Sequence, residues 1–160
     1  MALTRIAVED DLSALMRLIN IAFEVERFFI NVERVTRDDM RGLFAKGAFL
    51  VTGEMDACVY VELRGNRGYL GLLSVDPARQ GSGLGKGMVT AAEQYCRARG
   101  CGWMDLRVVS LREELPPFYR KLGYRECGEE PFLSEVETKL PCHLVKMQKE
   151  LAAPALANGS

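Results

Sequence analysis

The sequence predicts a mixed α/β domain in which helices pack against a mostly antiparallel sheet. Three strand-like runs follow one another with short polar turns between them, at residues 48–52, 57–63 and 69–75, which is typical of an antiparallel meander. A helix with one apolar face comes next, and a further strand, 103–109, follows it. Strand, helix and strand in this order form a βαβ unit whose two strands run parallel. The predicted sheet is therefore mixed.

The N-terminal part is expected to supply one short strand and two helices. Residues 3–8 are strand-like, and apolar residues then recur at three- and four-residue spacing over 12–23, which indicates an amphipathic helix. The Thr36 hydroxyl and the acids after it suit the start of a second helix, which ends near Ala45. Paired phenylalanines among charges in 24–35 fit no period, so we expect a helix end or a shaped loop there.

The C-terminal part is expected to add a short helix and two strands. The helix, at 113–122, tolerates two prolines if they fall in its first turn. A strand begins at 124–127, a polar loop occupies 128–141, and alternation over 142–151 predicts a final strand.

We expect one domain over residues 1–151, because a chain of 160 residues can bury one sizeable core. Residues 152–160 have no pattern and are expected to be disordered. The net charge of -1 argues against sequence-independent binding of nucleic acid, which needs a basic excess. Neither a signal peptide nor an apolar run of membrane-spanning length is found, so we expect a cytoplasmic protein that binds no membrane.

No metal site is expected. The five cysteines form an odd set without a CxxC pair or a nearby histidine to complete a zinc site. We interpret them as free thiols in a reducing cytoplasm. The only histidine, His143, lies at the start of the final strand and is interpreted as a hydrogen-bonded structural residue.

Three glycines at alternate positions, Gly81, Gly83 and Gly85, lie between the strand at 69–75 and the helix after it. Glycines permit positive φ and leave space for a ligand, so several N–H groups can converge on one point. The helix dipole and the unpaired amides of the first turn favour negative charge at the same point. The loop is therefore expected to bind phosphate.

Two well-known phosphate-binding motifs do not fit this loop. A Walker A loop needs glycine at position 80 and Ser or Thr at 87, where the chain has Gln80 and Gly87. A dinucleotide fingerprint needs glycine at 86 or 88, where Lys86 and Met88 stand. The alternating strands and helices of a doubly wound nucleotide fold are also lacking.

The segment Gln80–Gly85 resembles the Q/R-x-x-G-x-G/A motif of the GNAT acyltransferases, which transfer acyl groups from coenzyme A to amines. Two further phrases extend the resemblance, Leu73-Ser74-Val75-Asp76-Pro77 before the loop and, at 117–124, PFYRKLGY after the next strand. The resemblance covers the chain from its first strand to its last. It implies a GNAT-type fold with a twisted, mostly antiparallel sheet, and acetyl-CoA as the co-substrate.

The resemblance also implies which residues bind coenzyme A. The strand backbone at Leu73, Ser74 and Val75 would bind the pantetheine arm, and Ser110 replaces an asparagine that many members have near the cofactor. Separation of the strands at 69–75 and 103–109 would open the cleft for the thioester. The pyrophosphate would be held by the loop residues Gln80, Gly81, Ser82, Gly83, Leu84, Gly85 and Lys86.

For the chemistry, the resemblance implies that Tyr119 is the general acid for the departing thiolate, since a phenol is protonated at neutral pH. Its placement depends on the motif, because the connection before it is about two residues longer than usual and carries two prolines. Asp105 is a candidate base, although a solvated carboxylate paired with a neighbour such as Arg107 is the favoured interpretation. Glu62, Glu113 and Glu114 are not better supported.

The predicted reaction is direct transfer of an acetyl group from acetyl-CoA to a primary amine in a ternary complex. The small size of the chain favours a small-molecule acceptor over a protein amine. Acids in the variable segments 24–35 and 128–141 could attract a cationic amine, although solvated surface charge is the default. These acids are Glu24, Glu26, Glu129, Glu130, Glu135 and Glu137.

Two alternatives stay open: a non-catalytic acyl-CoA-binding regulatory module, and a nucleotide-binding module that uses the same loop. The resemblance also suggests a homodimer, which is frequent in the family.

Overall fold

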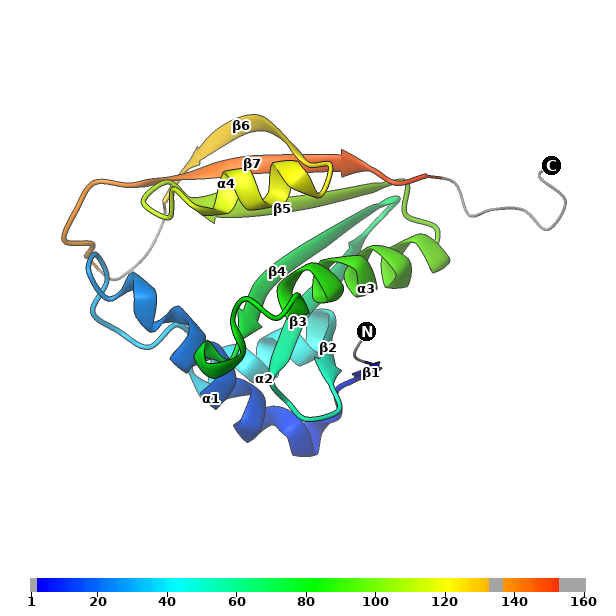
Figure 1. The fold of residues 1–160 in the computed structure, drawn as a ribbon, viewed down its shortest axis with the longest axis horizontal. Coiled ribbons are helices and arrows are strands. Elements are labelled where there is room, and N and C mark those ends of the chain that lie inside the picture. Colours follow the sequence, from blue (N-terminus) through cyan, green and yellow to red (C-terminus); the bar gives the residue numbers. More distant parts are fainter. Residues whose placement is uncertain (1–2, 133–136, 153–160) are drawn as a thin grey trace, which may run out of the picture.

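A computed structural model describes residues 3–132 and 137–152 and contains a seven-stranded sheet in the order β1-β2-β3-β4-β5-β7-β6 (Figure 1). The strands are β1 (Thr4–Ile6), β2 (Ala48–Thr52), β3 (Ala57–Arg64), β4 (Arg67–Val75), β5 (Trp103–Val109), β6 (Arg125–Pro131) and β7 (His143–Glu150). The helices are α1 (Leu12–Ala22), α2 (Arg37–Lys46), α3 (Leu84–Ala98) and α4 (Leu115–Lys121), with the short turns η1 (Glu9–Asp11), η2 (Phe23–Glu26) and η3 (Pro77–Arg79).

The mixed sheet predicted from the sequence is confirmed. Strands β1 to β4 form an antiparallel series, and β4 pairs with β5 in parallel. Helix α2 begins after Thr36, whose hydroxyl accepts a hydrogen bond from the Asp39 amide at 3.1 Å. The start of α4 has proline in its first turn, as expected.

The prediction of a polar loop from residue 128 is wrong for 128–131. Strand β6 continues to Pro131, and its register with β7 runs from Arg125 opposite Gln148 to Pro131 opposite His143. The segment is rich in Glu and Gly and has little intrinsic β preference, but pairing with β7 supplies its partners. Charged residues are also common on an edge strand because they discourage further pairing. Most of the predicted tail, and Glu135, lie outside the described residues.

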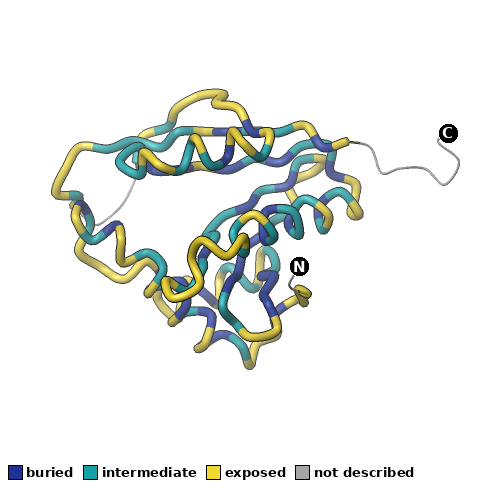
Figure 2. The backbone as a smooth tube through the Cα atoms, viewed as in Figure 1, coloured by how far each residue is buried: buried dark blue, intermediate teal, exposed yellow. Residues whose placement is uncertain are grey.

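Helices pack on both faces of the sheet. On one face, Met88 and Ala92 of α3 pack with Leu70 of β4 and Met104 of β5. On the other face, apolar side chains of α1 and α2 pack on the N-terminal strands, and this second core contains Leu15, Ile19, Met40, Phe49, Val51 and Tyr60. Figure 2 shows the buried backbone concentrated in the central strands and along the inner sides of the helices.

The parallel pairing of β4 with β5 is confined to one end of the two strands. The paired residues are Arg67 with Trp103, Gly68 with Met104 and Tyr69 with Asp105. Beyond Tyr69 the two strands diverge (Figure 1), while β5 continues to pair with β7 as far as Val109. The separation predicted between these strands is therefore present, and within residues 3–132 and 137–152 it leaves one edge of β4 without a neighbouring strand.

A bulge in β4 lies where the separation begins. Tyr60 of β3 is opposite Gly71 of β4, but Cys58 is opposite Ser74, so one extra residue is inserted in β4. Leu72 there has a φ of 51°, unusual for a residue with a side chain. Leu72 packs toward the α1 side, whereas Leu73 packs toward the α3 side. The bulge therefore changes the direction of the strand at the edge of the opening.

The paired end of β4 and β5 depends on Gly68. A Cβ atom at this position would lie 2.7 Å from both Cys96 Sγ and Met104 Sδ. We expect Gly68→Ala to lower the free energy of unfolding by about 1–3 kcal/mol through overpacking. The measurement is denaturant unfolding. Gly42→Ala is the control, because Gly42 lies in α2 with open space around it, and it should raise stability by about 0.5–1 kcal/mol.

Candidate active site

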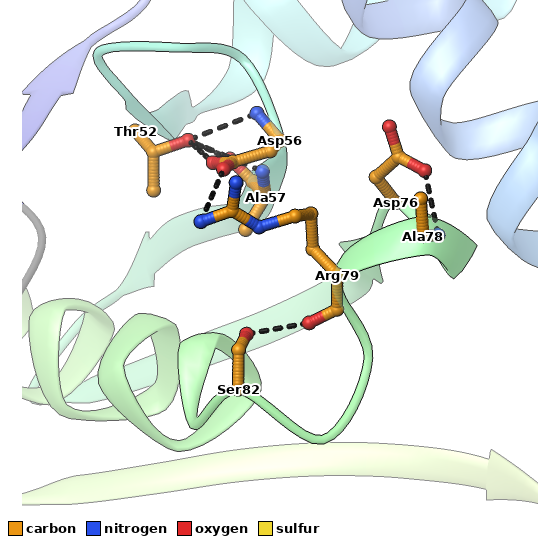
Figure 3. Close-up of polar contacts among 7 residues, drawn as sticks. All are labelled: Thr52, Asp56, Ala57, Asp76, Ala78, Arg79 and Ser82. Carbon is orange, nitrogen blue, oxygen red and sulfur yellow. Dashed lines mark hydrogen bonds and ion pairs between the residues drawn. The ribbon is translucent and has the colours of Figure 1, made fainter.

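The loop between β4 and α3 is tied to the turn between β2 and β3 (Figure 3). Asp76 accepts a hydrogen bond from the Ala78 amide at 2.9 Å and so caps η3. Arg79 lies 3.8 Å from the Asp56 carboxylate. Asp56 is in turn fixed by Thr52, whose hydroxyl accepts a hydrogen bond from the Asp56 amide at 3.0 Å. These contacts give the loop a defined path before the glycines begin.

Two of the three loop glycines have the positive φ that the sequence predicts, whereas Gly85 lies in the first turn of α3. Gly81 and Gly83 have φ of 83° and 86°, and open space surrounds the position of a Cβ atom at each. Gly83 caps α3 without a side-chain hydrogen bond, and the first helical bond of this end is donated by the Gly87 amide to the Gly83 carbonyl. The amides of Leu84–Lys86 therefore have no partner within the helix. This end of α3 is suited to an anion.

The resemblance indicated three residues of β4 for binding the pantetheine arm, and they do not all face the free edge of this strand. The Asp76 amide donates to the Asp56 carbonyl at 2.8 Å, so Asp76 and, two residues before it, Ser74 present their backbone groups to β3. The backbone groups of Leu73 and Val75 then face the opposite edge, where β5 has separated. These two residues offer the free N–H and C=O groups that an extended arm could bind.

Tyr119 is buried on α4, with 5% of its surface exposed. Its ring packs edge-on against Phe118 and Tyr124, at centroid distances of 5.0 and 5.7 Å. Burial raises the pKa of Tyr119 well above its ordinary value, the Tyr69 phenol adds to the rise, and Arg112 opposes it. The phenol therefore keeps its proton at neutral pH, as a proton donor requires.

Asp105 lies at the paired end of β5 and is held by Arg67. Arg67 Nε and Nη2 each donate to one carboxylate oxygen at 2.7 Å, and Nη2 also donates to Gln148 at 3.0 Å. The prediction that Asp105 pairs with Arg107 is wrong, because Arg107 instead donates to Glu130 at 3.1 Å. The parallel register places Tyr69 opposite Asp105, which brings Arg67 beside it. Both carboxylate oxygens are thus occupied by a bidentate, charge-assisted contact with Arg67.

Ser110 continues the ladder between β5 and β7. Its amide donates to the His143 carbonyl at 2.8 Å, and its hydroxyl oxygen accepts from the His143 amide at 3.0 Å. The hydroxyl hydrogen stays available for donation. The His143 imidazole lies 3.1 Å from the Glu129 carboxylate at the surface.

A buried ion pair that the sequence did not predict lies at the open end of the sheet. Glu26, in η2, accepts a hydrogen bond from Arg112, before α4, at 3.0 Å, and their side chains are 11% and 15% exposed. Burial raises the pKa of Glu26 above its ordinary value, although Arg112 opposes the shift. The same segment is joined to the C-terminal part, because the Lys139 amide donates to the Phe29 carbonyl at 2.7 Å. The residues before α2 therefore bridge the two separated halves.

The described residues contain no cluster of three or more His, Cys, Asp or Glu side chains that could hold a metal ion. All five cysteines are free thiols. In the described part of the chain, no helix combines the length and apolar character of a membrane span.

An enzyme that moves an acyl group needs a place for the anionic carrier of that group and a proton donor for the leaving atom. The N-terminal end of α3 is suited to an anion, and the Tyr119 phenol holds a proton at neutral pH. The sequence model of the acetyltransferase (GNAT) domain matches residues 23–151. Because that match covers most of the chain, the protein belongs to the GNAT acetyltransferase family and is an acyltransferase.

Solved structures support the fold over the whole chain. The ribosomal-protein-S18-alanine N-acetyltransferase of Escherichia coli superposes with a TM-score of 0.74 at 16% identity, covering 99% of this chain and 98% of that one. A putative acetyltransferase of Salmonella typhimurium, solved with its cofactor acetyl-CoA, has a TM-score of 0.72 at 21% identity, covering 96% of each chain.

A curated relative matches a shorter stretch. The glucosamine 6-phosphate N-acetyltransferase of Trypanosoma brucei brucei is 36% identical over 64 residues, which are 39% of this chain and 42% of that protein. The match thus spans less than half the length of this relative.

The raised pKa of Glu26 predicts how stability responds to pH. The folded state binds this proton more tightly than the unfolded chain, so stability from this group rises as pH falls from the folded-state pKa to the ordinary glutamate value. Above the folded-state pKa, the full cost of burying the carboxylate is present. We expect the unfolding free energy of the native protein to increase relative to Glu26→Gln as pH is lowered through this window. Denaturant unfolding at several pH values measures it, and a constant difference would contradict the prediction.

Proposed function

We propose that the protein transfers an acetyl group from acetyl-CoA directly to the primary amine of a small molecule. The observation that carries the proposal is the separation of β4 from β5 after Tyr69, beside a glycine loop with free amides and a protonated phenol. Acetyl-CoA supplies the acetyl group as a thioester. The single sheet from β1 to β7 supports the prediction of one domain over residues 1–151.

The residues at the loop fit the carrier. The amides from Gly81 to Lys86 would hold the pyrophosphate, since the left-handed glycines remove side chains from the approach and the helix end favours negative charge. Leu73 and Val75 would bind the pantetheine amides at the free edge of β4, and Ser110 can donate its remaining hydrogen from the opposite strand. Ser74, also predicted to bind, would contribute through the position of its neighbours, because its backbone faces β3.

Tyr119 is proposed as the general acid. The thiolate that leaves after attack needs a proton, and a buried phenol with a raised pKa holds one at neutral pH. Tyr119 is positioned by packing against Phe118 and Tyr124, so the hydroxyl has little freedom to move away.

The amine must also lose a proton to a base or to water. Asp105 stays the candidate, but both of its oxygens accept hydrogen bonds from Arg67. This ion pair supports the structural interpretation of Asp105, and the proton of the amine would then pass to water. The pH dependence of kcat/KM distinguishes a structural role of Asp105 from a catalytic one. Asp105→Asn would alter this pH dependence only if the carboxylate accepts the proton of the amine.

The amine acceptor is proposed to be a small molecule. The relative named for glucosamine 6-phosphate supports this choice and makes an amino sugar a suitable first substrate. A protein amine is the second candidate, supported by the fold similarity to an enzyme named for a ribosomal protein. A cytoplasmic location agrees with five free thiols. The homodimer stays a prediction, which light scattering can test.

Substitution of the acid tests the mechanism. We expect Tyr119→Phe to lower kcat by about 10²-fold or more, because a general acid contributes at least that much, with little change in the KM for acetyl-CoA. The measurement is release of coenzyme A with a panel of primary amines. Tyr95→Phe, in α3 and stacked against Arg99, is the control and should retain full activity. Acetyl-CoA binding without turnover on any amine would favour a regulatory module instead.

Substitution in the loop tests the carrier site. Gly83→Ala places a side chain at a φ of 86°, which costs about 1–2 kcal/mol. If the loop must adopt this conformation to bind, the Kd for acetyl-CoA should rise about five- to thirtyfold. Isothermal titration measures it, with Gly102→Ala as the control, because Gly102 has open space and no positive φ. Competition by ATP or NAD would instead support a nucleotide-binding module.

A further inference from the structure

A pocket of about 370 Å³ lies on the sheet over β4, β5, β6 and β7. Its lining includes Asp105 and Arg107, which alternate along β5 with the buried Met104 and Leu106. Met104 and Leu106 belong to the core beneath α3, so the pocket opens on the opposite face of the sheet. That face is covered by α1 and α2 only over the N-terminal strands.

The lining of this pocket is basic, although the chain as a whole has a net charge of -1. Four basic side chains face two acidic ones, Asp105 and Glu130. The basic residues are Arg64, Arg67, Arg107 and Lys146. A local excess of positive charge in a concave site attracts anions.

Arg64 and Arg107 retain the most donors. Arg64 donates through Nε to Glu62 at 2.6 Å, and Arg107 donates through Nη1 to Glu130 at 3.1 Å. A guanidinium has five N–H donors in a planar fork, so each of the two has N–H groups to spare. Arg67 differs, because it is already bound to Asp105 and Gln148.

The two arginines approach one aromatic ring. The Arg64 guanidinium lies 4.2 Å from the centroid of the Tyr69 ring, and that of Arg107 lies 5.6 Å from it. Each guanidinium is paired with one carboxylate, Glu62 or Glu130, and an anion bound near both would accept from the N–H groups that these pairs leave unused. A phosphate or carboxylate also matches the fork geometry of arginine.

Tyr69 connects the pocket with the opening between β4 and β5. A Cβ atom on Gly71 would lie 2.9 Å from Tyr69 Cε2 and 3.0 Å from its hydroxyl, so the Tyr69 ring lies back over the bulge of β4. Tyr69 is also the last residue of β4 paired with β5. In addition, the Tyr69 phenol contributes to the raised pKa of Tyr119. A molecule in the pocket would therefore reach the place where β4 separates, near the proposed acid.

We propose that the amine acceptor carries an anionic group, a phosphate or a carboxylate, which Arg64 and Arg107 bind. The inference rests on the proposed acetyl transfer and names the class of its acceptor. With the anion held over Tyr69, the amine of a small acceptor is directed toward the bulge of β4. The pocket would thus favour acceptors that carry a negatively charged group in addition to the amine.

Binding of inorganic phosphate tests the site without turnover. Acetyl-CoA is kept at saturation, so that the pyrophosphate loop is filled. We expect saturable binding that Arg64→Gln and Arg107→Gln each weaken by about ten- to a hundredfold, the effect of losing one charge-assisted hydrogen bond. Arg99→Gln is the matched control, because Arg99 is exposed at the C-terminal end of α3, does not line the pocket and stacks on Tyr95 at 3.6 Å. This variant should bind phosphate as the native protein does. Equal phosphate binding by the native protein and all three variants would refute the anion site at Arg64 and Arg107.

Paired substrates test the role of the anion and its source. Coenzyme A release is compared for glucosamine and glucosamine 6-phosphate, ethanolamine and phosphoethanolamine, and β-alaninamide and β-alanine. We expect a higher kcat/KM for the anionic member of the phosphate pairs or of the carboxylate pair, and the preferred pair identifies the anion. The preference should fall at least tenfold in Arg64→Gln and Arg107→Gln. Arg107→Lys keeps the charge without the fork and should give an intermediate loss.

The outcomes separate the two proposals. Turnover of neutral and anionic amines at equal rates, unchanged in both arginine variants, would refute the anionic acceptor and leave acetyl transfer intact. Arginine-dependent phosphate binding without turnover of any amine would instead refute the proposed reaction and leave the anion site. Thermal unfolding of each variant shows that the fold is retained.

Discussion

The structure depends on the point at which β4 stops pairing with β5. Three pairs of residues hold the strands together, and the close approach of α3 at Gly68 fixes that end. Beyond Tyr69, β5 stays in the sheet through β7, whereas β4 stays in it through β3. One strand edge is left free inside the protein, where backbone N–H and C=O groups otherwise find partners. A ligand with amide groups can supply those partners, and the bulge at Leu72 lies at the start of this edge.

The separated halves are held together by contacts far from the paired end. Glu26 and Arg112 form a buried ion pair, and the backbone of Lys139 bonds to Phe29, so the segment between α1 and α2 bridges to the C-terminal half. Taking two charges out of water is costly, and a buried pair is weak evidence of net stabilisation. Its contribution is geometric, because it joins η2 to the segment that precedes α4, the helix of Tyr119.

The charged residues pair in the structure in ways that the sequence did not indicate. Acids of the variable segments suggested attraction of a cationic amine, and two of these, Glu26 and Glu130, are in fact paired with Arg112 and Arg107. Glu130 accepts from only one nitrogen of Arg107, which leaves this arginine N–H groups to spare, whereas the Glu26–Arg112 pair lies outside the pocket. With four basic and two acidic side chains in its lining, the pocket beside Tyr69 is basic in a protein of nearly balanced charge. The net charge of a chain does not describe the field at one of its surfaces.

Local signals in the sequence determined the elements and the conformation of the glycine loop, since glycine conformation, helix caps and apolar periodicity act over a few residues. Thr36, Gly81 and Gly83 occupy the positions that these signals predict. Only the tertiary structure decided which side chains meet. Arg67 reaches Asp105 across 38 residues and Arg112 reaches Glu26 across 86, and strand β6 forms because β7 lies beside it. Such pairs depend on strand register and on the packing of distant segments, which no short pattern encodes.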